Sequence, residues 1–107
     1  MHVLEPIWAI LGRKEKEQMS HKIISYDLRK PEQNYEGLIA AIQSYTYCKI
    51  NKSDWLIYTA DSCSNIRDYL KNFIDSNDTL FVAELSDNPG WWASYNLRDG
   101  AVKWLNS

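Results

Sequence analysis

Two stretches of the chain carry apolar residues at the spacing of an amphipathic helix. The apolar positions of the first, residues 34–44, are Tyr35, Leu38, Ile39 and Ile42. Those of the second, residues 62–74, are Ile66, Tyr69, Leu70, Phe73 and Ile74. Residues three and four positions apart lie on one face of a helix, so each stretch is predicted to be a helix that packs this face on a core. Side-chain oxygens that could cap the two helices belong to Asn34 for the first and to Asp61, Ser62 and Ser64 for the second.

Shorter stretches rich in β-branched and aromatic residues predict strands at residues 22–26, 46–50, 55–59 and 79–85. Turn residues at 51–54 join the second and third strands into a hairpin. The last stretch, TLFVAEL, is the most continuous apolar run outside the helices. We therefore expect it to be a well-buried strand.

The resulting order, β-α-β-β-α-β, indicates an α+β domain with the ferredoxin-like fold, in which two helices cover one face of a four-stranded antiparallel sheet through right-handed crossovers. The opposite face is left bare, and we expect it to meet a second subunit or the C-terminal segment. That segment is predicted to form a short helix around 97–105 or, in part, a fifth strand around Trp91–Tyr95. Residues 19–107 are assigned to this domain and residues 1–18 to an N-terminal extension.

The composition is that of a folded domain, because 45% of the 107 residues are hydrophobic and 24% are charged. A disordered chain is thereby excluded. The formal net charge is −2, so any binding of nucleic acid must come from a local basic patch. The five Trp and seven Tyr are a heavy aromatic load for a chain of this length, which predicts a homodimer with aromatic residues at its interface.

The cysteines and the N-terminal stretch indicate a cytoplasmic protein with no membrane partner. Cys48 and Cys63 form no CxxC motif and are expected to be reduced, although a disulfide between them stays open. The apolar run around Ile7–Leu11 is too short to span a bilayer. Its basic residues follow the run, which is the reverse of a signal peptide.

Asp27 is the first candidate for chemistry, because it is a carboxylate that ends the first predicted strand. Mg²⁺ takes one or two carboxylates together with water and phosphate oxygens, and the nearby Arg29 and Lys30 could hold a phosphodiester. Asp27 is thus a candidate metal ligand and catalytic residue. The alternative is an ordinary turn residue that caps local amides.

The other candidates have plainer alternatives. Arg67 and Lys71 lie four apart on the second helix and form a small basic stripe for nucleic acid, or a solvated helix face. Glu84 is either a functional group or an exterior strand residue. The loop carboxylates are expected to be solvated turn residues: Asp75, Asp78 and Asp87. The C-terminal aromatics either stack on bases or form a core or dimer interface: Trp91, Trp92, Tyr95 and Trp104.

Three groups of residues together resemble a known family. They are IISYDL at 23–28 with Pro31, Ser62 with Ile66-Arg67-Asp68, and Asn77-Asp78 followed by Leu80-Phe81-Val82 and Leu85. This pattern resembles the SinR family, small ferredoxin-like relatives of CRISPR-associated protein 2, and is similar to virulence-associated protein D. It extends over about Lys22 to Leu105. The resemblance implies a dimer in which Asp27 of both subunits binds a divalent metal, and an activity as endoribonuclease or non-catalytic architectural protein.

Two functions therefore stand side by side. The first is a homodimer that binds RNA or DNA, and in its catalytic form is a Mg²⁺-dependent endonuclease. The second is a non-catalytic dimeric interaction protein, such as an antitoxin, immunity protein or regulator, that contacts a protein partner through its aromatic C-terminus.

Overall fold

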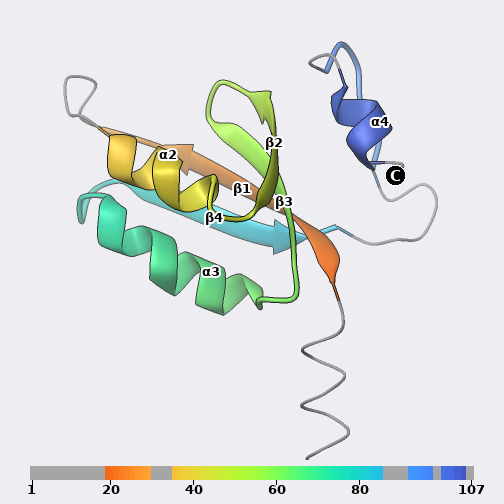
Figure 1. Ribbon diagram of the computed structural model, residues 1–107. Helices are drawn as coiled ribbons and strands as arrows, with labels where there is room; N and C mark the ends of the chain where they lie inside the picture. Colours follow the sequence, from red (N-terminus) through yellow and green to blue (C-terminus); the bar gives the residue numbers. More distant parts are fainter. Residues whose placement is uncertain (1–18, 30–34, 86–91, 98–99, 106–107) are drawn as a thin grey trace, which may run out of the picture.

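The computed structural model describes residues 19–29, 35–85, 92–97 and 100–105. Within them the chain forms an α+β fold with one four-stranded antiparallel sheet (Figure 1). Its elements in chain order are β1 (Ser20–Asp27), α2 (Glu36–Ile42), β2 (Thr46–Asn51), β3 (Asp54–Thr59), α3 (Cys63–Leu70), a 3₁₀ turn (Lys71–Phe73), β4 (Thr79–Glu84) and α4 (Ala101–Leu105). The described part holds no helix that is long and apolar enough to cross a membrane.

The strand order in the sheet is β2-β3-β1-β4. At its centre, Ile24 of β1 lies opposite Trp55 of β3 on one side and Val82 of β4 on the other. Residues opposite each other in an antiparallel pair point to the same face, so this register sorts the side chains of all strands into two faces.

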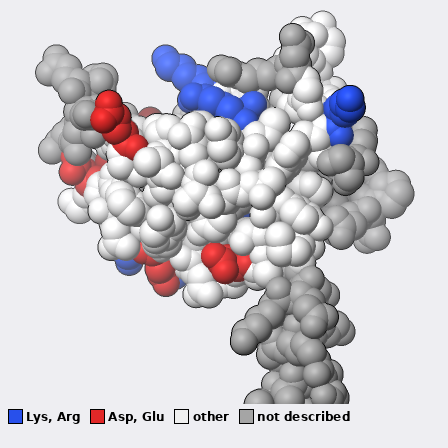
Figure 2. Space-filling model, viewed as in Figure 1, with Lys and Arg blue, Asp and Glu red and all other residues white. Residues whose placement is uncertain are grey.

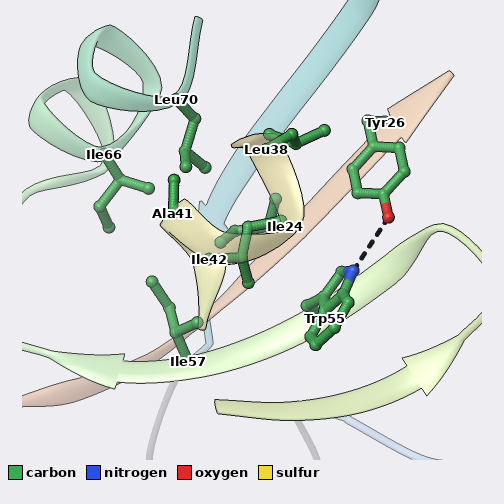
Figure 3. Packing of buried hydrophobic residues seen from close by; sticks show 9 residues of the cluster. All are labelled: Ile24, Tyr26, Leu38, Ala41, Ile42, Trp55, Ile57, Ile66 and Leu70. Atoms are coloured by element: carbon green, nitrogen blue, oxygen red, sulfur yellow. Dashed lines mark hydrogen bonds between the residues drawn. The ribbon is translucent and has the colours of Figure 1, made fainter. Parts of the chain in front are cut away.

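One face of the sheet packs against α2 and α3 (Figure 3). Helix residues spaced by three and four meet every second residue of β1 and β3, as the predicted periodicities require. Full burial of these aliphatic side chains supplies the main favourable free energy of folding. The cluster consists of Ile24, Tyr26, Trp55 and Ile57 from the strands, Leu38, Ala41 and Ile42 from α2, and Ile66 and Leu70 from α3.

The opposite face is partly covered by the C-terminal segment. Ala101 of α4 is fully buried against Ile50 and Leu56, and Trp104 and Leu105 pack around them. The short C-terminal helix is thus confirmed, and α4 stands apart from α2 and α3 in Figure 1. Residues 92–95 contain no strand, while Trp91 and the N-terminal extension lie outside the described residues.

The helix ends agree with the predicted capping in one case. The Ser62 hydroxyl accepts a hydrogen bond from the amide of Asn65 at 3.1 Å and so caps α3. The helix that begins after Tyr35 is shorter than predicted, and Tyr35 makes no side-chain cap. The other predicted cap, Asn34, lies outside the described residues.

The expectation of a well-buried strand at 79–85 is wrong. β4 lies at the edge of the sheet, none of its residues is fully buried, and the Phe81 side chain is 60% exposed. Only Leu80 and Val82 reach the core under the helices. A short apolar run does not distinguish a central strand from an edge strand, because the difference depends on how many neighbours the strand pairs with.

The hydrogen bond from Trp55 Nε1 to the hydroxyl of Tyr26, 3.0 Å long and buried, supports a first prediction (Figure 3). Tyr26→Phe should lower the free energy of unfolding by about 1–3 kcal/mol, because it leaves the indole N–H without its partner. Urea denaturation measures this change. In the control, Tyr47→Phe removes the hydroxyl of a tyrosine that is 44% exposed and should cost less than about 0.5 kcal/mol. Equal effects of the two variants would contradict the assignment.

Candidate functional site at the end of β1

Asp27 is the last residue of β1, and its side chain is 69% exposed. It follows the core residue Tyr26, so it points to the sheet face opposite α2 and α3. Its Oδ2 lies 3.6 Å from Nε of Arg29, whose side chain is also exposed. The structure therefore presents a carboxylate and a guanidinium side by side to solvent.

Asp78 fixes the backbone that carries this pair. Its Oδ1 accepts a hydrogen bond from the amide of Arg29 at 2.7 Å, and its Oδ2 accepts one from the amide of Asp75 at 2.8 Å. The hydroxyl of Tyr35 donates to the same carboxylate at 3.0 Å. One side chain thus ties together the segment after β1, the start of α2 and the turn before β4. Asp78 is a turn residue as expected, with its amide bonded to the carbonyl of Asp75, but it is half-buried by these three donors rather than solvated.

Asp27 is the carboxylate at this place that could serve as a metal ligand. No group of three or more His, Cys, Asp and Glu side chains comes together anywhere in the described residues. Mg²⁺ is commonly bound through one or two carboxylates and completes its shell with water and phosphate oxygens. Asp27 fits this donor chemistry as a single ligand.

The basic residues predicted to contact nucleic acid do not all gather around Asp27. Arg67 and Lys71 line an open groove of about 520 Å³ beside β4, together with Asp75 and Asp78. Nη2 of Arg67 is 2.9 Å from the carboxylate of its neighbour Asp68, which offsets its charge. Asp78, which lines the groove, also accepts the hydrogen bond of the Arg29 amide; Lys30 lies outside the described residues.

Figure 2 shows further Lys and Arg side chains at separate places on one face of the molecule. Blue atoms lie over the turn between β2 and β3, which carries Lys52, and beside α4, which carries Lys103. Red atoms occupy the left and lower edges of the same view. On this face the described Lys and Arg side chains lie apart rather than in one ridge.

Glu84 is an exterior strand residue, which was the alternative to a functional role. Its side chain is 59% exposed, and its Oε1 lies 3.4 Å from Nζ of Lys22. Lys22 was missed at the sequence level: it is buried, and its ammonium also donates to the backbone carbonyl of Thr59 at 3.1 Å. The signal was present, because Lys22 precedes Ile24 and Tyr26 at the inward-facing spacing of two.

The C-terminal aromatics that the structure describes differ in their exposure. Trp104 is half-buried and packs within its own chain, with its ring centroid 5.1 Å from that of His21. Tyr95 is 89% exposed and Trp92 is half-buried. Trp91 lies outside the described residues. Tyr95 is thus the most exposed of the three described residues of this set.

Two other titratable groups are disfavoured as reactive species. Both cysteines are free, and burial raises the pKa of the Cys48 thiol, which disfavours the nucleophilic thiolate. Burial also raises the pKa of the Tyr45 hydroxyl to about 12, and the nearby Asp61 carboxylate and Tyr69 add to the rise. Tyr45 therefore stays neutral near pH 7.

No protein-family model and no curated protein matches the chain. The resemblance to the SinR family stays a prediction that rests on the residues quoted for it.

The role of Asp78 supports a second prediction. Asp78→Ala removes the acceptor of the Arg29 amide and should destabilise the fold by about 1–3 kcal/mol. Hydrogen exchange of the Arg29 amide should speed up more than exchange in the centre of β1. The control Asp68→Ala removes an exposed carboxylate and should change stability by less than about 0.5 kcal/mol. Unchanged protection of the Arg29 amide in Asp78→Ala would show that Asp78 does not hold this loop.

Proposed function

We propose that the chain forms a ferredoxin-like homodimer that binds nucleic acid and cleaves it with a divalent cation held by Asp27 of both copies. The observation that carries this proposal is the exposed Asp27 carboxylate beside the exposed Arg29 guanidinium at the end of β1. The carboxylate suits a hard cation, and the guanidinium suits the phosphate that such a cation would activate.

The order of the strands supports the proposed fold. β1 and β2 are both antiparallel to β3, which lies between them, so they run parallel to each other. By the same reasoning β3 and β4 are parallel with β1 between them. Two interleaved βαβ units of this kind, with α2 and α3 on one face, are the arrangement of the split βαβ fold.

A two-fold axis near Asp27 would complete the donor set. Two carboxylates that approach each other repel, and a divalent cation between them removes the repulsion. Mg²⁺ at this position would polarise a phosphodiester oxygen. Arg29 from each copy would then orient the phosphate by paired N–H donors.

The exposed aromatic residues support a second candidate function, a non-catalytic dimeric interaction protein. Phe81 is 60% exposed on the same sheet face as Asp27, and Tyr95 is 89% exposed. Large exposed aromatic side chains are enriched at protein interfaces. With a net charge of −2, such a surface would suit a basic protein partner.

The nuclease proposal predicts the effect of removing one charge. Asp27→Asn keeps the shape of the side chain and should abolish cleavage of labelled RNA or DNA in Mg²⁺ or Mn²⁺, while the thermal unfolding temperature stays within a few degrees of the wild type. EDTA should abolish cleavage by the wild type in the same assay.

Asp68→Asn is the matched control, because Asp68 is also an exposed carboxylate paired with an arginine. It should cleave at the wild-type rate within about twofold, since exposed pairs contribute little to the fold. Cleavage by Asp27→Asn at the wild-type rate, or no cleavage by the wild type, would refute the nuclease proposal. The interaction-protein function would then take its place.

The dimer proposal predicts a sedimenting mass of twice 12.5 kDa at micromolar concentration. Phe81 is exposed on the sheet face of Asp27, where the two-fold axis is proposed. Phe81→Asp should therefore shift the protein toward monomer, because it would bury a charge between the two copies. The control Tyr69→Asp places the same charge on α3, on the other side of the sheet, at a residue that is 40% exposed. A wild-type mass of one chain, or equal dissociation by both variants, would contradict this interface.

A further inference from the structure

A small aromatic pocket lies between α4 and the sheet, away from Asp27. Its lining residues come from four elements: His21 of β1, Thr46 of β2, Tyr58 of β3 and Trp104 of α4. His21 is opposite Tyr58, and Tyr58 is opposite Thr46, so the three lie side by side across one face of the sheet. The pocket has a volume of about 250 Å³.

Three rings form its walls. The His21 ring centroid lies 4.8 Å from that of Tyr58, with the planes at 44°, and 5.1 Å from that of Trp104, with the planes at 72°. Tyr58 is 38% exposed, so part of its ring is accessible to a ligand. The hydroxyls of Thr46 and Tyr58 and the imidazole nitrogens of His21 add hydrogen-bonding groups to these walls.

We propose that this pocket binds one unpaired nucleobase of a single-stranded nucleic acid. A nucleobase is a flat ring with polar edges, which matches aromatic walls that carry a few donors and acceptors. The volume suits one ring system and not a base pair. The inference rests on the proposed nucleic-acid function and adds single-stranded nucleic acid as its substrate class.

Charge gives a second reason for stacking. The chain carries a net charge of −2, so non-specific attraction to the phosphate backbone is weak, and binding needs a contribution that does not depend on charge. Stacking of a base on an aromatic ring supplies such a contribution and tolerates any sequence.

The pocket is distinct from the candidate metal site. His21 and Asp27 lie on the same face of β1, and six residues of a strand separate them by about 20 Å. A base held beside Trp104 therefore leaves Asp27 free to act on another part of the same strand.

A quaternary ammonium group is the rival ligand, because aromatic rings set at large angles also bind cations. One observation favours the nucleobase. Lys103, next to Trp104 in α4, is exposed. Its positive charge disfavours a cationic ligand and favours a ligand that carries a phosphate.

The test uses the full chain and NMR signals of the Tyr58 ring and the Trp104 indole. Adenosine, guanosine, cytidine and uridine 5′-monophosphates are titrated separately, and choline is the rival probe. At least one nucleotide should shift both signals, and choline should shift neither. Tyr58→Leu should weaken nucleotide binding about tenfold, since it removes one stacking ring. Tyr47→Leu is the matched control, because it removes a similarly exposed tyrosine from the other face of the sheet and should leave affinity unchanged.

Three results would overturn the pocket assignment: no shift of either signal with any nucleotide, shifts with choline alone, or equal losses in the two leucine variants. The wild-type titration decides the first two without any variant. A labelled single-stranded oligonucleotide separates this inference from the proposed function. If nucleotides bind the pocket but the oligonucleotide is neither bound nor cleaved, the pocket assignment is supported and the proposed function is refuted. If the oligonucleotide binds wild type and Tyr58→Leu equally, the pocket assignment is refuted and the binding of nucleic acid is supported.

Discussion

The middle of the two central strands is apolar on both faces, and most of the architecture follows from this constraint. Ile24 and Ile57 point to one face, while Ile23 and Leu56, their neighbours in β1 and β3, point to the other. A sheet with one polar face can leave that face in water, but this sheet needs a cover on each side. The helices α2 and α3 cover the first face, and α4 with Leu97 covers part of the second.

The helix α4 covers only part of the second face, and this decides which side chains stay accessible to a ligand or partner. Contacts of α4 concentrate on β2, while Phe81 of β4 and Asp27 at the end of β1 stay exposed. The pocket beside Trp104 forms where α4 meets the strands. The Asp27 site and the aromatic pocket are thus two consequences of one incomplete layer. Asp78 adds order at the exposed end, because it holds the backbone of Arg29 against the turn before β4.

The periodicity of the sequence predicts the helices and strands, but it does not predict how deeply each of them is buried. The helical spacing of Ile66 and Leu70 and the capping role of Ser62 were both legible, because each depends on residues close in sequence. The edge position of β4 was not, since it depends on which strands pair. Asp27 was identified as the end of a strand, whereas the bonds of Asp78 to Arg29 and Tyr35 join residues more than 40 positions apart and leave no local signal. For Trp104 the sequence left a core position and a dimer interface open, because composition does not distinguish them, and the structure packs it against its own sheet.

The central claim is that Asp27 binds a divalent cation, and paramagnetic line broadening by Mn²⁺ tests it most directly. Substoichiometric Mn²⁺ added to the ¹⁵N-labelled protein should broaden the amide signals of Asp27 and Arg29 first, and excess Mg²⁺ should restore them. The same addition to Asp27→Asn should leave these signals sharp. Broadening that is absent at Asp27, or that persists in Asp27→Asn, would contradict the account.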